Sequence, residues 1–292
     1  MTSPNATHES TTATATADRT PVRMAVLMCP PTYFDVLYAI NPWMDPTVPT
    51  DTELAVAQWR ELRDTYTRIG IDVEEIEGVE GLPDMVYAAN GATVVNGIAY
   101  TASFRFPERQ PEADAYAAWL DRAGYEVVEA TAVNEGEGDF LVVGDVLLAG
   151  TGFRSTIASH REAAEVFGRE VVTLMLVRPE YYHLDTALAV LDARPGREQI
   201  AYLPSAFAPS SRAELERRFP DALIVEEDEA AMLALNVVSN GRDVVMPSRA
   251  TRFAEALRER GFNPVGVDLS ELLKGGGGVK CCTLDLRGKN EA

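Results

Sequence analysis

The sequence predicts an α/β fold in which a unit of two strands and one helix recurs around a common axis. β-rich runs occur in pairs that flank turn residues, and a stretch with helical spacing of apolar residues follows each pair. The turns fall near positions 96, 145, 195 and 241, so the unit recurs at intervals of about 46 to 50 residues, which is typical of a repeat architecture. Such units form blades with helices outside, within one closed domain. The periodicity leaves an open α/β sandwich as the alternative.

Each element is predicted from its own residues. A buried strand at 22–28 precedes a helical pattern at 59–68. Four hairpins follow, around Asn96-Gly97 (93–101), Gly144-Asp145 (140–149), Arg194-Pro195-Gly196 (186–192 with 199–203) and Asn240-Gly241 (234–246). Each precedes a predicted helix, at 111–123, 159–167, 210–219 and 248–261, and Gly124 and Gly168 are typical helix stops. Residues 282–286 predict a terminal strand.

Length and composition limit the domain organisation and the partners. The 292 residues are 46% hydrophobic, which is enough for a large core. Residues 1–20 are rich in Thr, Ala and Ser and predict a disordered tail, which leaves 21–290 as a single catalytic domain. The net charge of −19 disfavours nucleic acid and anionic membranes as partners, and it suits a small cationic substrate. A homo-oligomer is compatible with the sequence.

The cysteines indicate the compartment. Cys29, Cys281 and Cys282 are odd in number and include two neighbours that rarely bridge, which favours a reducing cytoplasm over a disulfide framework. No apolar run reaches the ~20 residues that a membrane-spanning helix needs. We therefore expect a cytoplasmic location.

Three histidines offer few candidates for catalysis. His8 lies in the predicted tail, and His160 begins a polar helix, where an exposed surface residue is expected. His183 stands at an element end, from which a rigid scaffold can project a catalytic group. A loop histidine without a catalytic role is the simpler interpretation of His183.

A run of four glycines, 275–278, precedes Cys281 and Cys282. Glycines let a ligand approach the chain closely, and neighbouring side chains on a strand point to opposite faces, so one thiol would face a cleft. The alternative is that both thiols are small buried apolar groups. The chain has no C-x-x-C or H-E-x-x-H spacing, so we expect no metal site.

The acidic segment 134–139 places three carboxylates and two glycines directly before a strand. A solvated acidic turn is one interpretation. The other is a cation site, because closely placed carboxylates hold the planar donor fork of a guanidinium.

Together these segments resemble the pentein (guanidine-modifying) superfamily, in its dimethylargininase, arginine dihydrolase and amidinotransferase branch. The resemblance covers about residues 23–287 and implies a five-bladed pseudosymmetric α/β propeller (pentein fold) built from ββαβ-type units. It implies Cys281 as the nucleophile, His183 as the catalytic histidine, and Glu135 as the catalytic acid, with Glu137 as the alternative because the acidic motif carries an extra residue.

The resemblance also implies a set of substrate-binding residues. Asp84 matches the aspartate that holds the guanidinium, Arg109 and Arg154 match the arginines that bind the substrate's α-carboxylate, and Asp139 belongs to the acidic motif. Asn90 replaces an acidic residue of the dimethylargininases. With the segments 29–31 and 40–44, which contain Asn41, it looks more like the arginine dihydrolase type.

The expected function is therefore hydrolysis of a guanidinium C–N bond of arginine or methylated arginine through a covalent Cys281 amidino intermediate. The product is citrulline, or ornithine after a second round. No metal or organic cofactor is expected, because the charge of the substrate activates its own carbon. An amidinotransferase, in which an amine replaces water, is the alternative enzyme, and a non-catalytic binding protein on the same scaffold is the alternative of another class.

Overall fold

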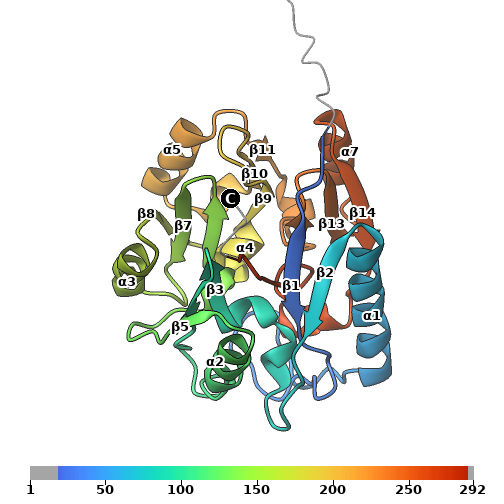
Figure 1. Ribbon diagram of the computed structural model, residues 1–292. Helices are drawn as coiled ribbons and strands as arrows, with labels where there is room; N and C mark the ends of the chain where they lie inside the picture. Colours follow the sequence, from blue (N-terminus) through green and yellow to red (C-terminus); the bar gives the residue numbers. More distant parts are fainter. Residues whose placement is uncertain (1–18, 289–292) are drawn as a thin grey trace, which may run out of the picture.

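The computed structural model describes residues 19–288, and within this range the strands form five three-stranded sheets (Figure 1). In four sheets, an antiparallel hairpin is followed by a helix and by a third strand parallel to the hairpin's second strand. These units are β3 (Ala92–Val95), β4 (Ile98–Thr101), α2 (Glu112–Arg122) and β5 (Glu126–Val128); β6 (Phe140–Val143), β7 (Val146–Thr151), α3 (Ile157–Phe167) and β8 (Glu170–Met175); β9 (Leu188–Asp192), β10 (Gln199–Tyr202), α5 (Pro209–Arg218) and β11 (Leu223–Ile224); and β12 (Val238–Ser239), β13 (Asp243–Pro247), α7 (Thr251–Glu259) and β14 (Asn263–Val267).

The fifth sheet joins the two ends of the described chain. β1 (Met24–Met28) pairs in parallel with β2 (Ile71–Glu75), which follows α1 (Thr52–Arg68). On its other side β1 pairs antiparallel with β15 (Leu284–Asp285), the last strand. This unit therefore repeats the plan of the other four, with its first strand supplied from the far end of the sequence.

The five sheets surround the short helix α4 (Leu184–Ala187), and α1, α2, α3, α5 and α7 lie on the outside (Figure 1). First strands of different units contact one another, as β15 does β3, and as β9 does both β6 and β12. Five small sheets replace the single open sheet that a sandwich would require. The arrangement is consistent with a five-bladed propeller of ββαβ-type units.

The predicted turns and helix stops account for the local structure. Asn96 and Gly97 have φ of 52° and 80°, as the two-residue hairpin between β3 and β4 requires. Gly168, with φ of 61°, ends α3 in the left-handed conformation. The four hairpins and the helices that follow them are thereby confirmed, with end shifts of a few residues. Residues 1–18 of the predicted tail, including His8, lie outside the described range.

Four predicted elements were wrong in part. The last outer helix begins at Thr251 and not near 248, because the Glu229 carboxylate accepts hydrogen bonds from the backbone N–H groups of Arg252 and Phe253 and so caps it there. Residues 186–187 belong to α4, and 234–237 are irregular, where strands were expected. Cys281 and Cys282 lie in a turn before β15, so the strand alternation expected for them does not apply.

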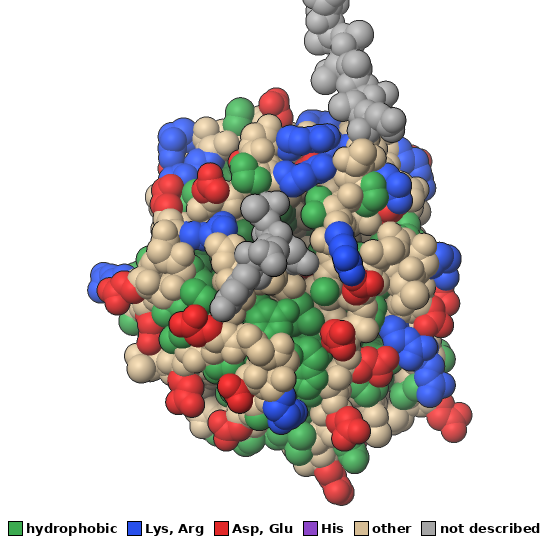
Figure 2. All heavy atoms as spheres, in the orientation of Figure 1, with side chains coloured by type: hydrophobic (Ala, Val, Ile, Leu, Met, Phe, Trp, Pro, Cys, Tyr) green, Lys and Arg blue, Asp and Glu red, His purple; other side chains and the backbone are tan. Residues whose placement is uncertain are grey.

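Apolar side chains fill the space between sheets and outer helices. The largest cluster joins three consecutive units and includes Leu148, Leu191 and Val244, all 0–1% exposed. Acidic and basic side chains are interspersed over the face in Figure 2, with green apolar groups between them. Over residues 19–288, none of the helices combines the length and the apolar character needed to cross a membrane.

Candidate active site

The His183 imidazole and the Glu135 carboxylate are in contact at the N-terminal end of the central helix α4. His183 is the N-cap residue of α4, and its Nε2 lies 2.7 Å from Glu135 Oε2. The two residues are 1% and 0% exposed. Burial opposes ionisation of Glu135, but the Arg154 guanidinium and His183 outweigh it and lower the pKa of that carboxyl to about 2. Glu135 is therefore ionised at neutral pH and can orient the imidazole and stabilise its protonated form.

The Cys281 thiol contacts the same helix. Its Sγ donates a hydrogen bond of 3.3 Å to Asp185 Oδ2, and Asp185 follows His183 by two residues on α4. Asn236 Nδ2 donates a second hydrogen bond, of 3.1 Å, to this sulfur. Residues that lie far apart in the sequence thus meet at one point of the fold.

Backbone contacts close this arrangement into a ring. The short 3₁₀ helix η2 (Ala88–Gly91) carries Asn90, whose Nδ2 donates to the backbone oxygen of Glu135 at 3.3 Å. The preceding residue, Ala89, donates its N–H to the backbone oxygen of Cys281 at 3.0 Å. A ring of contacts and chain neighbours therefore runs from Cys281 to Asp185, along α4 to His183, on to Glu135 and Asn90, and through Ala89 back to Cys281. Cys281 is thus hydrogen-bonded to the same short helix that has His183 as its N-cap.

The surroundings of Cys281 favour its thiol form. Burial raises the pKa of Cys281 well above its ordinary value, and the Asp185 charge adds to this effect. Burial also raises the pKa of Asp185 to about 7, although the hydrogen bond from the thiol lowers it. A bound cation would stabilise the ionised forms of both groups.

Two carboxylate oxygens of the site have no hydrogen-bond partner among residues 19–288. They are Asp185 Oδ1 and Asp84 Oδ1, and both are buried. The other Asp84 oxygen accepts the Tyr38 hydroxyl at 2.9 Å, and burial raises the Asp84 pKa although Arg109 opposes the shift. An unpaired buried acceptor is costly, and a guanidinium supplies planar donors for such oxygens.

The two predicted carboxylate-binding arginines are both held by internal acids. Arg154 donates to Glu135 Oε2 at 2.8 Å, and its guanidinium stacks on the rings of Phe106 and Tyr182 at 4.7 and 4.5 Å. Arg109 makes two hydrogen bonds, of 2.9 and 2.8 Å, to the buried Glu112 carboxylate. Arg109 also donates to Asn90 Oδ1 at 2.8 Å, which ties it to η2.

The remaining acids of the motif lie in different surroundings from Glu135. Glu137 pairs with Lys280 at 2.5 Å and with Arg287, away from the imidazole. Asp139 accepts from the Ser155 hydroxyl at 2.6 Å and from the backbone N–H of Leu184 at 3.2 Å. Asp139 therefore supports the segments that carry Arg154 and His183.

A loop after β1 covers the site. Tyr38 donates to Asp84, the backbone oxygen of Ile40 accepts from Arg154 at 2.8 Å, and Trp43 Nε1 donates to the backbone oxygen of Glu180 at 3.0 Å. Asn41 donates to the backbone oxygen of Gly275 at 3.1 Å and so joins this loop to the glycine run. The predicted substrate contact Asn41 thus lies between the covering loop and the segment that leads to Cys281.

The prediction of a surface position for His160 was wrong. His160 is 2% exposed, and its ring nitrogens contact Thr173 Oγ1 at 2.9 Å and the Gly150 backbone oxygen at 3.0 Å. The helix α3 turns this residue toward β7 and β8, where its ring also meets Phe140 edge to face. His160 is a hydrogen-bonded core residue.

Three residues of the site were missed in the sequence. Asp185 stands two places after His183, Glu112 stands one helical turn after Arg109, and Asn236 is a single polar residue in the apolar run 234–238. The position of Asn236 was the clearest signal of a site residue, because an amide within an apolar run must find hydrogen-bond partners once it is buried.

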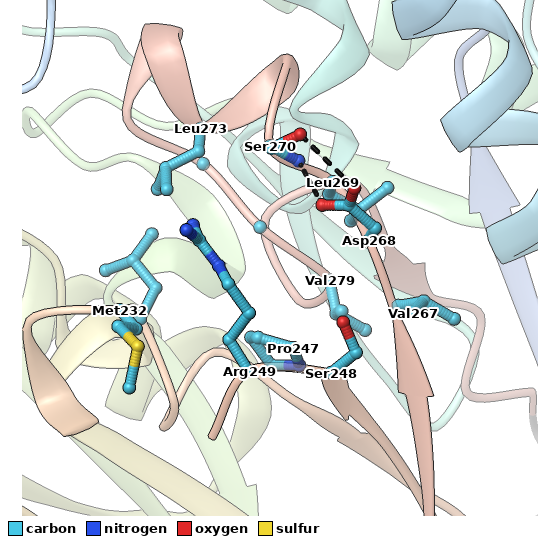
Figure 3. Close-up of a pocket in the computed structure, with 13 residues that line it drawn as sticks. Met232, Pro247, Ser248, Arg249, Val267, Asp268, Leu269, Ser270, Leu273 and Val279 are labelled. Carbon is cyan, nitrogen blue, oxygen red and sulfur yellow. Dashed lines mark hydrogen bonds between the residues drawn. The ribbon is translucent and has the colours of Figure 1, made fainter. Parts of the chain in front are cut away.

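Two hollows lie outside the contacts described so far, and the larger, of about 630 Å³, is lined by residues of α1 and of the segment after β1, among them Trp59, Arg60 and Arg63. A pocket of about 30 Å³ adjoins the glycine run, where Arg249 extends across it toward Leu273 (Figure 3). Its volume suits about one water molecule and is too small for an amino acid. Within residues 19–288, His, Cys, Asp and Glu side chains do not gather in threes in a way that could hold a metal ion.

Comparison with known proteins yields close relatives, although no family model matches the chain. The N(G),N(G)-dimethylarginine dimethylaminohydrolase of Mycobacterium tuberculosis is 53% identical over 270 residues, covering 92% of this chain and 88% of that protein. The bifunctional arginine dihydrolase/ornithine cyclodeaminase ArgZ of Synechocystis is 37% identical over 266 residues, which cover 89% of this chain but 37% of ArgZ.

Solved structures agree with these relatives. A crystal structure of the N-terminal domain of cyanobacterial ArgZ, an arginine dihydrolase, bound to its substrate superposes with a TM-score of 0.87 at 36% identity. The match covers 91% of this chain and 98% of that one. A dimethylarginine dimethylaminohydrolase structure superposes with a TM-score of 0.73 at 20% identity, which shows the shared fold.

Proposed function

The chain belongs to the family of dimethylarginine dimethylaminohydrolase and the arginine dihydrolase domain of ArgZ, whose members are C–N hydrolases, and we propose that its substrate is free arginine or a methylated arginine. The ring of contacts from Cys281 through Asp185, His183, Glu135 and Asn90 carries this proposal. Its support is that the buried Cys281 thiol contacts Asp185 while His183, two residues earlier, contacts the buried Glu135 carboxylate. Net charge and three free thiols fit a cytoplasmic enzyme for a small cation.

Binding begins with the guanidinium between Asp84 and Asp185, whose unpaired oxygens accept its N–H groups. Its positive charge opposes the burial that keeps Cys281 protonated, so the thiol proton passes to His183. Glu135 stabilises the imidazolium at 2.7 Å. The thiolate then attacks the central guanidinium carbon, and a tetrahedral adduct forms.

Collapse of the adduct breaks one C–N bond. The imidazolium of His183 gives its proton to the departing nitrogen, which leaves as ammonia or a methylamine, and an amidino-thioether remains on Cys281. His183 next takes a proton from water, and the resulting hydroxide attacks the same carbon. The C–S bond breaks as the hydroxyl of the adduct becomes the carbonyl of citrulline and loses its proton to solvent, where the released amine takes it up. Citrulline is released, and the thiolate recovers its proton from His183.

The amino-acid end of the substrate is assigned to the two arginines. Arg154 is well placed for the α-carboxylate because Phe106 and Tyr182 fix the plane of its guanidinium. Arg109 is the second partner, and its bonds to Glu112 hold it beside Asn90. Asn41 connects the covering loop to the glycine run over this end of the site.

Two observations favour different leaving groups. The 53% identity to a dimethylarginine dimethylaminohydrolase favours dimethylamine. Asn90 in place of an acidic residue, and the superposition on 98% of the ArgZ domain, favour ammonia from arginine, with ornithine as the product of a second round. Because Asn90 belongs to the ring of contacts itself, we propose arginine ahead of dimethylarginine as the substrate.

Mass-spectrometric identification of products from arginine, dimethylarginine, citrulline and agmatine tests the proposal. We expect citrulline or ornithine from arginine, and no product with Cys281→Ser. Addition of glycine or lysine checks the transferase alternative, since an amidino product on the added amine would replace citrulline. If no guanidino compound loses an amine to water, the proposed substrate class is wrong.

A further inference from the structure

Asn236 has no assigned part in the steps above, yet it is the side chain most closely joined to Cys281. It is 0% exposed and is flanked by the apolar residues Leu235 and Val237. Its Nδ2 donates to Cys281 Sγ at 3.1 Å, and its Oδ1 accepts the backbone N–H of Cys281 at 3.1 Å. The Asn236 amide is therefore hydrogen-bonded to both the backbone and the sulfur of Cys281.

The orientation of this amide is fixed by its partners. Nδ2 also donates to the backbone oxygen of Asp185 at 3.1 Å, so both of its hydrogens are used. A flipped amide would place an N–H against the Cys281 N–H and an oxygen against the Asp185 carbonyl. Both contacts would be repulsive, and the donor is thereby held toward the sulfur.

The backbone that presents Asn236 is unusual. Asn236 N–H donates to the backbone oxygen of Leu233 at 2.9 Å, and Leu233 has φ of 54°. Leu233 is 1% exposed, and a left-handed conformation at a buried non-glycine residue is costly, as is typical near functional sites. Gly278 packs against the same amide, since a Cβ there would lie 2.9 Å from Asn236 Oδ1.

We propose that Asn236 is a positioning residue that holds the Cys281 sulfur in place and donates the hydrogen bond that stabilises its thiolate. This inference rests on the proposed function of Cys281 as nucleophile. The sulfur has an acceptor, Asp185, and a donor, Asn236. When a guanidinium engages Asp185 and the thiol loses its proton, the Asn236 donor remains on the sulfur. The same donor stabilises the sulfur again when it leaves the amidino-thioether.

The test measures thiolate formation directly. Asn236→Ala removes the amide, and Asn236→Asp keeps an oxygen for the Cys281 N–H but replaces the donor. The rate of alkylation by iodoacetamide is followed against pH, and tandem mass spectrometry separates Cys281 from Cys282. Because a hydrogen bond to a charged group contributes about 1.5–3 kcal/mol, we expect the alkylation midpoint to rise by about one to two pH units in both variants. With arginine as substrate, kcat should fall at least about tenfold, while KM should change less.

Asn240→Ala supplies a matched control. Asn240 is 2% exposed and follows β12, but its Oδ1 accepts from Arg242 and Asp243, not from the site. Thermal unfolding shows which variants are folded. One folded Asn236 variant, either Ala or Asp, is enough for the alkylation test. An alkylation midpoint within about 0.3 pH units of the parent, in a folded Asn236 variant, would overturn the inference. A shifted midpoint in a protein that cleaves no guanidino compound would retain it and reject the proposed function.

Discussion

Glu135 Oε2 accepts from both His183 and Arg154, at 2.7 and 2.8 Å, so one buried oxygen joins the imidazole to a guanidinium. Its neighbour in the motif, Glu137, instead pairs with Lys280 and lies 3.0 Å from the backbone N–H of Asp285. Two glutamates separated by one glycine thus belong to different parts of the molecule, one to the proposed chemistry and one to the support of the chain end.

Exchange of each glutamate for glutamine should separate these roles. Glu135→Gln removes the charge that stabilises the imidazolium, and we expect kcat to fall at least about a hundredfold with the fold retained. Glu137→Gln breaks a buried ion pair, and we expect a loss of about 3–5 kcal/mol in the free energy of unfolding. Urea unfolding and steady-state kinetics on both variants measure the two effects. Equal kcat values in both variants would contradict the assignment.

Exchange of the two neighbouring cysteines should likewise separate a residue that acts in the proposed chemistry from one that does not. Cys281→Ser should retain the fold and lower kcat to below about one-thousandth, because a hydroxyl at this position is a far weaker nucleophile. Cys282 is 0% exposed and has no part in the proposed steps, so Cys282→Ser should retain substantial activity. Product formation from arginine compares them. Retained turnover in Cys281→Ser would remove the nucleophile assignment.

Much of the fold could be predicted because its determinants are local. Asn96-Gly97 and Gly168 prefer positive φ in any context, and each stands where the chain turns or a helix ends. The parallel third strands could not be read from the hairpin pattern, since they pair only after a helix has returned the chain to the sheet. They followed from the family resemblance alone.

The site was predictable to the extent that its residues are rare types. With three histidines and three cysteines in the chain, His183 and Cys281 could be selected by elimination and by resemblance. Burial was not predictable: His160 lies on a helix of polar composition, and its partners Thr173 and Gly150 are supplied by other elements. Asn236 and Asp185 were missed for the same reason, because their contacts with Cys281 span 45 and 96 residues.

Arg154→Lys should test the proposed carboxylate contact. Lysine keeps the charge beside Glu135 but loses the planar fork, so kcat should change little while KM for arginine rises about tenfold or more. Agmatine has no carboxylate and should show little change in KM. Steady-state kinetics on both substrates decide the matter, and an equal effect on agmatine would contradict a carboxylate-binding role.

Asp185 should destabilise the folded protein at neutral pH. Burial raises its pKa from an ordinary value of 3.8 to about 7, so between these values the folded state holds a proton that the unfolded state has lost. The free energy of unfolding must then fall as pH rises through this window. Asp185→Asn removes the titration and keeps an oxygen for the thiol. We expect the free energy of unfolding of the variant to exceed that of the parent by on the order of 2–4 kcal/mol at pH 8 and by little at pH 4. The variant should also lose activity.

Asp285 provides the control of opposite sign for this measurement. It is also buried, but Lys280 and Arg287 outweigh the burial and lower its pKa, so its charge contributes stability that is present above its ordinary pKa and lost as pH falls. Asp285→Asn should therefore be less stable than the parent at pH 8, where Asp185→Asn is more stable. Urea unfolding of the three proteins at pH 4 and pH 8 measures both. If Asp185→Asn is less stable than the parent at pH 8, the fold stabilises the Asp185 carboxylate. The unpaired Oδ1 atom would then not be explained as part of a cation-binding site.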